Sequence, residues 1–382
     1  MKANFKKMDK ILLFLMIAFT IFGAVMIFSA SSITAVLYNR REEYYFFTKH
    51  LYIIAASWIF GLIVLNIPLK RYKFLAPLGI ITIILLLFGL FIYAPLTHSV
   101  RSWYDLGFFS LQPSEFAKSI VIVYLAVALD KIHRKKDYKI KKVVAPFVFV
   151  LIIFGLTFAQ PDMGTAVIIV GIAVFIFMAL PFKDRDIKNL KLLGTGMVLL
   201  GILIILFGSN VLTSEQASRL YFRKPCTRYL DKTGYQVCNG FIAISNGGLT
   251  GKGLGDSTQK FMYLPEAYTD FVFPIIIEEI GAIGGLFIIF LYGVMLYRIL
   301  KISLNASTLS GSIMAFGTFI FLLLHLLINF LGVLALIPLT GVPIPFLSYG
   351  GSFFINVIFV LCLTQRVQIE SYDAKKAKIL RA

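Results

Sequence analysis

The chain has 382 residues, of which 59% are hydrophobic and only 15% charged, and its mean hydropathy is +0.86. Because soluble domains usually have about a quarter of their residues charged, this composition excludes a soluble globular protein and a disordered chain. Three cysteines are too few for a disulfide-dense secreted module. The composition is typical of a membrane helix bundle, in which a net charge of +18 predicts basic cytoplasmic loops rather than nucleic-acid binding.

Ten segments are long and apolar enough to predict membrane-spanning helices, which need about 20 residues each. The first segment follows Lys6, Lys7 and Lys10 as a signal peptide would, but its length and the nine later spans favour an uncleaved anchor. The sequence therefore predicts an all-α, polytopic membrane bundle that forms one domain over residues 1–382. The predicted spans are 11–30, 51–67, 74–95, 114–132, 143–158, 163–180, 192–208, 270–291, 310–328 and 353–364.

The distribution of basic residues predicts the orientation. Alternate connections and both terminal segments hold 25 of the 37 Lys and Arg residues, whereas the short segments 31–50 and 96–112 hold 4. The positive-inside rule then places the N-terminus and a C-terminal tail, 365–382, in the cytoplasm.

A long connection, 209–269, is predicted as an extracytoplasmic loop between spans seven and eight. Loops of this length inside compact proteins are usually functional or disordered. Its glycine-dense stretch 246–255 favours tight backbone turns near a ligand over a flexible spacer. Cys226 and Cys238 also lie in this loop, either as a disulfide or as two free thiols.

Polar residues near the start of span four form the first candidate site, because a bilayer opposes such residues unless they are functional or paired. Glu115 and Lys118 share a helical face and form either a structural ion pair or, for Lys118 together with Arg101, a contact to an anion. Trp103 is either an interfacial belt residue or a stacking platform for a sugar.

Two further groups interrupt the predicted helices. Gln160 and Asp162 lie between spans five and six, where Asp162 is either the N-cap of the next helix or part of a polar lid. The stretch 341–352, which includes Ser348, contains two prolines and three glycines and cannot form a regular helix. It predicts a re-entrant segment beside the site, with a simple outer loop as the alternative.

Carboxylates gather at the start of span eight. Thr269 or Asp270 could cap this helix, but a cap explains only one of Glu266 and Asp270, so we assign this pair to chemistry. Glu278 and its neighbour Glu279 lie more than two turns deeper, and at least one of them must face the interior of the bundle.

Five sequence motifs, taken in their order along the chain, resemble those of the SEDS family (shape, elongation, division and sporulation proteins). The resemblance covers nearly the whole chain. The loop is more similar to the division and sporulation branch (FtsW-like) than to the elongation branch (RodA-like). One departure is His98-Ser-Val-Arg-Ser-Trp103, which lacks a basic residue that is usual there. The five motifs are QPSEFAK at 112–118, QPDMGTA at 160–166, GGLTGKGLGDSTQK at 247–260, YLPEAYTDF at 263–271 and PIPFLSYGG at 343–351.

The resemblance implies a peptidoglycan glycosyltransferase of the bacterial plasma membrane. Such enzymes polymerise lipid II, a disaccharide-pentapeptide on undecaprenyl pyrophosphate, and are paired with a class B penicillin-binding protein that acts as transpeptidase. The family's essential aspartate matches Asp270. Two alternatives remain at this point, namely a lipid II flippase and a non-catalytic division scaffold.

The chemistry of lipid II polymerisation suggests roles for these residues. Asp270 is the predicted general base, and the multiply negative pyrophosphate needs cations, with a divalent Mg²⁺ or Mn²⁺ possible and no organic cofactor expected. Cationic candidates for that contact are Arg101, Lys118, Arg219, Lys252 and Lys260. Further predicted substrate contacts are Trp103, Gln112, Glu266 and Ser348, and predicted structural or cavity residues are Glu115, Gln160, Asp162 and Glu278.

Overall fold

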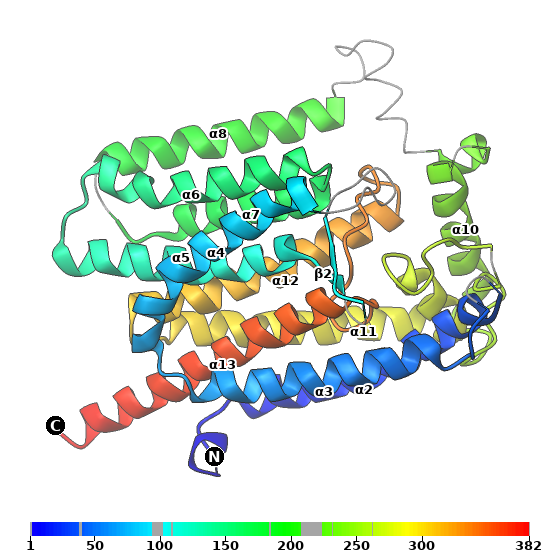
Figure 1. Cartoon of the computed structure of the whole chain (residues 1–382), viewed down its shortest axis with the longest axis horizontal. Coiled ribbons are helices and arrows are strands. Elements are labelled where there is room, and N and C mark those ends of the chain that lie inside the picture. The colour runs from blue at the N-terminus through cyan, green and yellow to red at the C-terminus, as the bar shows by residue number, and fades with distance from the viewer. Residues whose placement is uncertain are drawn as a thin grey trace.

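A computed structural model describes residues 2–37, 40–93, 102–107, 110–182, 185–207, 224–230, 232–261 and 263–381. Long helices lie side by side along a common axis, and both chain termini lie at one end of the bundle (Figure 1). The helices of the bundle are α2 (Lys10–Leu37), α3 (Tyr45–Asn66), α4 (Tyr72–Tyr93), α5 (Pro113–Lys135), α6 (Ile140–Ala159), α7 (Met163–Ala179), α8 (Arg185–Phe207), α11 (Val272–Leu304), α12 (Leu309–Val333) and α13 (Gly351–Ile379).

Shorter elements connect these helices. A two-stranded antiparallel sheet pairs β1 (Tyr104–Asp105) with β2 (Ser110–Leu111) just before α5. The remaining elements are α1 (Lys2–Phe5), η1 (Leu69–Arg71), η3 (Pro225–Arg228) and α10 (Lys232–Gly247).

The predicted all-α membrane bundle is confirmed, because each of the ten predicted spans corresponds to one helix from α2 to α8 or from α11 to α13. Among the helices that the structure describes, seven are long and apolar enough to cross a membrane, and α7 is a shorter apolar helix. Two helices extend well beyond the prediction. α11 continues to Leu304, and α13 continues to Ile379, so the predicted tail 365–382 is mostly the end of a helix.

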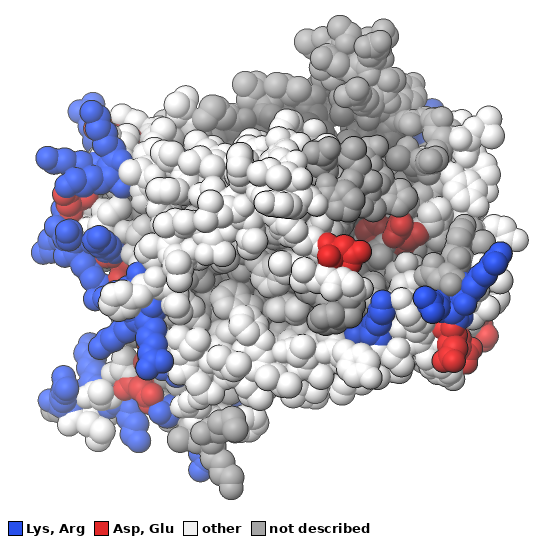
Figure 2. Space-filling view, viewed as in Figure 1, with Lys and Arg blue, Asp and Glu red and all other residues white. Residues whose placement is uncertain are grey.

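A buried contact joins α13 to the start of the chain. The side-chain amide of Gln365 is fully buried and donates to the backbone oxygen of Asp9, while its oxygen accepts from the Asp9 backbone nitrogen, each at 2.9 Å. Asp9 also pairs with Arg298 on α11. Figure 2 shows Lys and Arg side chains concentrated at the end of the bundle where both termini lie.

Helices α12 and α13 form the most buried part of the bundle, and within the irregular segment 334–350 between them residues 342–348 pack inward. A Cβ added to Gly23 on α2 would lie 2.1 Å from the backbone oxygen of Phe346, so only glycine allows α2 to approach this segment. Ile344, Phe346 and Ser348 are almost fully buried. The simple outer loop is therefore wrong for this segment, which is irregular backbone enclosed by protein.

The long connection contains its own structure where it is described. Helix α10 lies at the end of the bundle opposite to the chain termini and packs against α11 (Figure 1). A Cβ on Gly247 would lie 2.1 Å from the backbone oxygen of Ile277, which fixes how closely the two helices approach. Cys226 in η3 and Cys238 in α10 form a disulfide, so the paired alternative describes these two cysteines.

Candidate active site

Asp270 lies where three distant segments meet, directly before α11. The residue is 8% exposed and therefore buried. The side-chain amide of Asn329 on α12 donates to the backbone oxygen of Asp270 at 2.8 Å and to that of Val342 at 2.7 Å. Gly341 has a φ of +66°, and a Cβ added there would lie 3.7 Å from Asp270 Oδ2. Asn329 therefore holds the aspartate against the irregular segment.

The Asp270 carboxylate is free of a capping role. The N-cap residue of α11 is Phe271, and no side chain caps this helix. The alternative that Thr269 or Asp270 caps span eight is therefore wrong. Helix capping explains neither Glu266 nor Asp270.

Burial and a neighbouring negative charge oppose ionisation of Asp270. The Thr269 hydroxyl lies 2.7 Å from Glu266 Oε2 and 3.3 Å from Asp270 Oδ1, so it lies between the two carboxylates. Removal from water, and secondly the charge of Glu266, raise the pKa of Asp270 from 3.8 to about 7. A carboxylate with this pKa can accept and release a proton near neutral pH.

Glu278 anchors the glycine-rich loop to α11. It is fully buried, as predicted for one of the two deeper carboxylates, and its oxygens accept hydrogen bonds along the whole loop. The donors are Asn246 Nδ2 at 3.1 Å, Lys252 Nζ at 2.8 Å, Ser257 Oγ at 2.5 Å, Thr258 Oγ1 at 2.8 Å and the Gln259 backbone nitrogen at 3.1 Å.

A kink in α11 completes this attachment. Gly281 has non-helical angles, φ 78° and ψ 173°, which frees the backbone oxygens of Glu278 and Glu279. These accept from the backbone nitrogens of Lys252 and Gly253, each at 3.0 Å. The tight turns that the glycines predict are confirmed, because a Cβ on Gly251 would lie 2.2 Å from the Glu279 oxygen.

Lys252 and Lys260, two predicted contacts to pyrophosphate, both have carboxylate partners. Lys260 Nζ lies 3.1 Å from Glu279 and from the hydroxyl of Ser29, and its side chain is 4% exposed. The Lys252 side chain pairs with Glu278 but remains 31% exposed. Of these two cations, only Lys252 still reaches the surface.

Lys118 lies in an enclosed cluster between α5 and α12. Its Nζ is 2.8 Å from Glu115 and 3.1 Å from His325 Nε2, and the rings of Phe321 and Phe353 lie 5.7 Å away. The structural ion pair is therefore the arrangement that the structure has. Because His325 Nε2 faces an ammonium donor, its Nδ1–H donates to the Pro343 backbone oxygen at 3.1 Å.

Asp162 caps α7 and also accepts hydrogen bonds from residues at the start of α5. Its Oδ1 accepts from the Thr165 backbone nitrogen at 3.2 Å, which confirms the predicted N-cap of α7. Its Oδ2 accepts from Gln112 Nε2 and Ser114 Oγ, each at 3.1 Å. Gln160 donates to a backbone oxygen of α4 at 2.8 Å. These contacts account for Gln112, Gln160 and Asp162 by structure alone.

The remaining predicted residues are placed as follows. Ser348 is fully buried and accepts from the Ile344 backbone nitrogen at 2.8 Å, which closes a turn in the irregular segment. Trp103 is 40% exposed beside β1. Arg101 and Arg219 lie outside the described residues, so their predicted contacts to an anion stay predictions.

Comparison with known proteins identifies the family. A family model described as "Cell cycle protein", for the FtsW, RodA and SpoVE proteins, matches residues 9–373. The chain belongs to this family. The resemblance to SEDS proteins is thereby confirmed.

Individual FtsW and SpoVE relatives support this membership. The "Probable peptidoglycan glycosyltransferase FtsW" of Bacillus subtilis is 37% identical over 92% of this chain and 88% of its own length. "Stage V sporulation protein E" of the same organism is 33% identical over 90% of this chain and 92% of its own length. These matches favour the FtsW-like branch.

Solved structures share the fold of this FtsW/RodA/SpoVE chain. One, titled "Structural coordination of polymerization and crosslinking by a peptidoglycan synthase complex", has a TM-score of 0.75 at 23% identity. Thermus thermophilus RodA has a TM-score of 0.66 at the same identity. Each match covers 96% of this chain and 98% of the other chain.

Two residues that were not predicted, Asn329 and His325, lie on α12 and hold the segment that approaches Asp270. They are four residues apart and therefore share one helical face. Two polar residues at that spacing in an otherwise apolar span were the available signal.

Replacement of Asn329 by leucine tests whether α12 fixes Asp270. Asn329→Leu keeps a similar volume but leaves two buried backbone oxygens without a donor, at a cost of about 1–3 kcal/mol each. We expect a lower melting temperature in detergent and faster amide hydrogen exchange in residues 268–271 and 340–344. Asn66→Leu is the matched control, because Asn66 only donates to the exposed Leu62 oxygen of its own helix. Equal exchange rates in both variants would contradict this role.

Proposed function

We propose that this chain is a peptidoglycan glycosyltransferase that polymerises lipid II, with undecaprenyl pyrophosphate as the leaving group. The observation that carries the proposal is the Asp270 carboxylate, which is buried beside Glu266 and has a pKa near neutrality. It lies in the family motif YLPEAYTDF, and curated relatives are named as probable peptidoglycan glycosyltransferases.

In the proposed reaction, the hydroxyl oxygen of the acceptor sugar forms a bond to the anomeric carbon of the donor. The bond from that carbon to the pyrophosphate oxygen breaks, and both of its electrons leave with the pyrophosphate. The proton of the acceptor hydroxyl goes to Asp270. General-base assistance of this kind typically contributes 10²–10⁴-fold in rate, and it is most effective when the base has a pKa near the working pH.

The leaving pyrophosphate requires positive charge nearby. Lys252 is the described candidate that fits best, because its ammonium group is paired with Glu278 and yet its side chain is 31% exposed. Lys118 and Lys260 are enclosed, with side chains 0% and 4% exposed, so we assign Lys118 to the contact between α5 and α12 and Lys260 to the contact between the glycine-rich loop and α11. Arg101 and Arg219 stay proposed contacts.

We propose that both termini face the cytoplasm and that Asp270 faces outward. The basic end of the bundle holds the termini, which the positive-inside rule assigns to the cytoplasmic side (Figure 2). The disulfide lies at the opposite end, where an oxidising environment is available to a bacterial surface protein. The acceptor and donor lipids would then reach Asp270 from the outer leaflet.

A class B penicillin-binding protein is the proposed partner. A structural neighbour of the same fold comes from a complex that coordinates polymerisation with crosslinking. A transpeptidase beside this chain would crosslink the strands that this chain makes.

A lipid II flippase and a division scaffold are the competing functions. Neither requires a carboxylate with a pKa near 7 beside a second carboxylate at the mouth of a span. Transporters, the class to which a flippase belongs, are often built from two related halves with paired broken helices. Glycan formation by the purified protein separates the enzyme from both alternatives.

A divalent cation is proposed to neutralise part of the charge of the leaving pyrophosphate, since Mg²⁺ commonly binds through one or two carboxylates and substrate phosphates. Within the described part of the chain, no three His, Cys, Asp or Glu side chains gather to form a metal cluster by themselves. The ion would therefore arrive with the substrate. We expect EDTA to reduce glycan synthesis and added Mg²⁺ or Mn²⁺ to restore it. Full activity in EDTA would contradict the requirement for a divalent cation.

Replacement of Asp270 tests the general base. Purified Asp270→Asn, given lipid II in detergent, should lose about 10²–10⁴-fold in rate while keeping its melting temperature. Asp256→Asn is the matched control, because Asp256 is an exposed carboxylate in the neighbouring loop. Full glycan synthesis by Asp270→Asn would remove the aspartate from this role.

The pH dependence of polymerisation should report the same carboxylate. Because only the deprotonated form can accept a proton, kcat/KM should rise with pH with a midpoint near 7. Glu266→Gln removes a negative charge that disfavours ionisation, so the midpoint should move to lower pH. A midpoint that stays in place or rises in this variant would contradict the assigned cause.

A further inference from the structure

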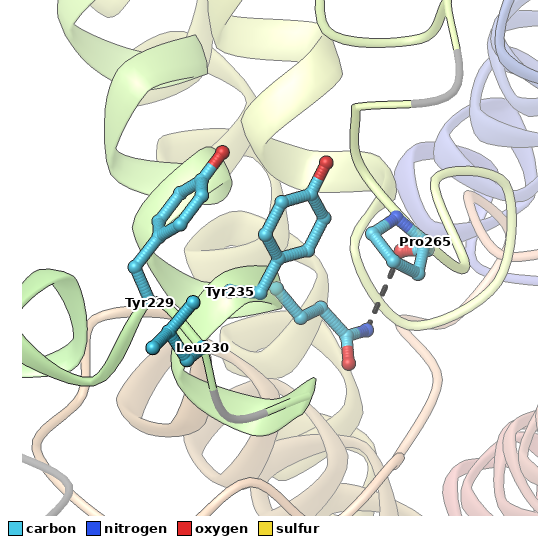
Figure 3. A pocket seen from close by; sticks show the side chains of 5 residues that line it. Tyr229, Leu230, Tyr235 and Pro265 are labelled. Carbon is cyan, nitrogen blue, oxygen red and sulfur yellow. Dashed lines mark hydrogen bonds between the residues drawn. The ribbon is translucent and has the colours of Figure 1, made fainter.

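A groove of about 590 Å³ lies on the outer part of the molecule, between the disulfide-bonded turn and α10. Its volume is within the range of small-ligand sites, about 300–1,000 Å³. Figure 3 shows the rings of Tyr229 and Tyr235 next to each other, with both hydroxyl groups pointing the same way. The groove is lined by Tyr229, Leu230, Tyr235, Gln236 and Pro265.

The lining has the chemistry of a sugar site. The ring centroids of the two tyrosines lie 4.8 Å apart, and the ring planes make an angle of 62°. Each ring has apolar faces and a polar hydroxyl at its tip. Sugar rings likewise have C–H groups on their faces and hydroxyls on their edges. None of the five lining residues is charged, so by its described side chains the groove suits a neutral saccharide better than a pyrophosphate.

The groove adjoins the segment that contains Asp270. Gln236 on α10 donates its side-chain amide to the Pro265 backbone oxygen at 3.4 Å (Figure 3), and Pro265 directly precedes Glu266. One turn further along α10, a Cβ added to Gly240 would lie 3.1 Å from the ring of Phe271. Helix α10 therefore packs along residues 265–271, and its groove flanks the proposed reaction site.

We propose that this groove binds the sugar backbone of the growing glycan strand, a β-linked N-acetylhexosamine polymer. The proposal rests on the proposed function and deepens it, because a polymerase that holds its product beside the reaction site adds several units before release. The groove then sets the length of the strand, whereas Asp270 sets the rate of each addition.

One covalent bond connects the two walls of the groove. Cys226 precedes Tyr229 by three residues, and Cys238 follows Tyr235 by three residues. The disulfide thus holds the turn that carries Tyr229 and Leu230 against the helix that carries Tyr235 and Gln236. Its removal should open the groove without changing any residue that lines it.

Strand length is the first measurement. Full-length protein in detergent without reductant is given lipid II, and product lengths are separated on a gel. We expect the double variant Tyr229→Ala with Tyr235→Ala to give strands that are several-fold shorter, with lipid II consumed at an initial rate within about twofold of the unchanged protein. Cys226→Ser with Cys238→Ser should give the same shortening. Tyr52→Ala, which removes a 77% exposed tyrosine from α3, is the matched control and should leave strand length unchanged.

Direct binding is the second measurement, and it does not depend on activity. The probe is chitotetraose, a soluble β-1,4-linked N-acetylglucosamine tetrasaccharide, and binding is followed by saturation-transfer NMR. We expect binding to the unchanged protein and to Asp270→Asn, and loss of binding in the tyrosine double variant. Unchanged strand length together with equal chitotetraose binding in that variant would overturn the groove, and would favour a protein partner as its occupant.

The two proposals fail in different ways. If the unchanged protein makes no glycan but binds chitotetraose through the tyrosines, the proposed function fails and the saccharide groove stands. If the tyrosine double variant makes glycan of the usual length and binds chitotetraose as well as the unchanged protein, the groove fails and the proposed function stands.

Discussion

Among the described residues, the enclosed carboxylate of Asp270 has no cationic partner, and this separates it from the other buried carboxylates. Glu115, Glu278 and Glu279 each have a lysine within 3.1 Å, which neutralises them and lets them hold helices and loops together. Among the described residues, no Lys or Arg forms an ion pair with Asp270. Its burial and the charge of Glu266 are therefore opposed by hydrogen bonds alone, and the pKa rises to about 7.

Two sets of contacts stabilise the surroundings of Asp270. Asn329 on α12 ties the Asp270 backbone to the irregular segment before α13. The glycine-rich loop is attached to α11 through Glu278, Glu279 and the kink at Gly281. These contacts are mostly buried, and those of Glu278 and Glu279 are charge-assisted, so they stabilise α11 and the segments packed against it.

The sequence alone predicted the helices and the carboxylate pair at the start of α11, and it gave the cap at Asp162 and the ion pair of Glu115 with Lys118 each as one of two alternatives. These follow from local rules of hydropathy, capping and helical spacing. The partners of Lys252 and Lys260 were not predicted, because Glu278 and Glu279 reach them only through a helix kink. Likewise, the roles of Asn329 and the tyrosine groove depend on contacts between segments that are distant in sequence.

The protonation state of Asp270 in the intact protein tests the account most directly. Infrared difference spectroscopy of the detergent-solubilised protein against Asp270→Asn would isolate the carboxylic-acid band of this single residue during a pH titration. We predict a band that is present in mild acid and disappears with a midpoint near pH 7. Disappearance of the band around the ordinary aspartate value of 3.8 would contradict the account.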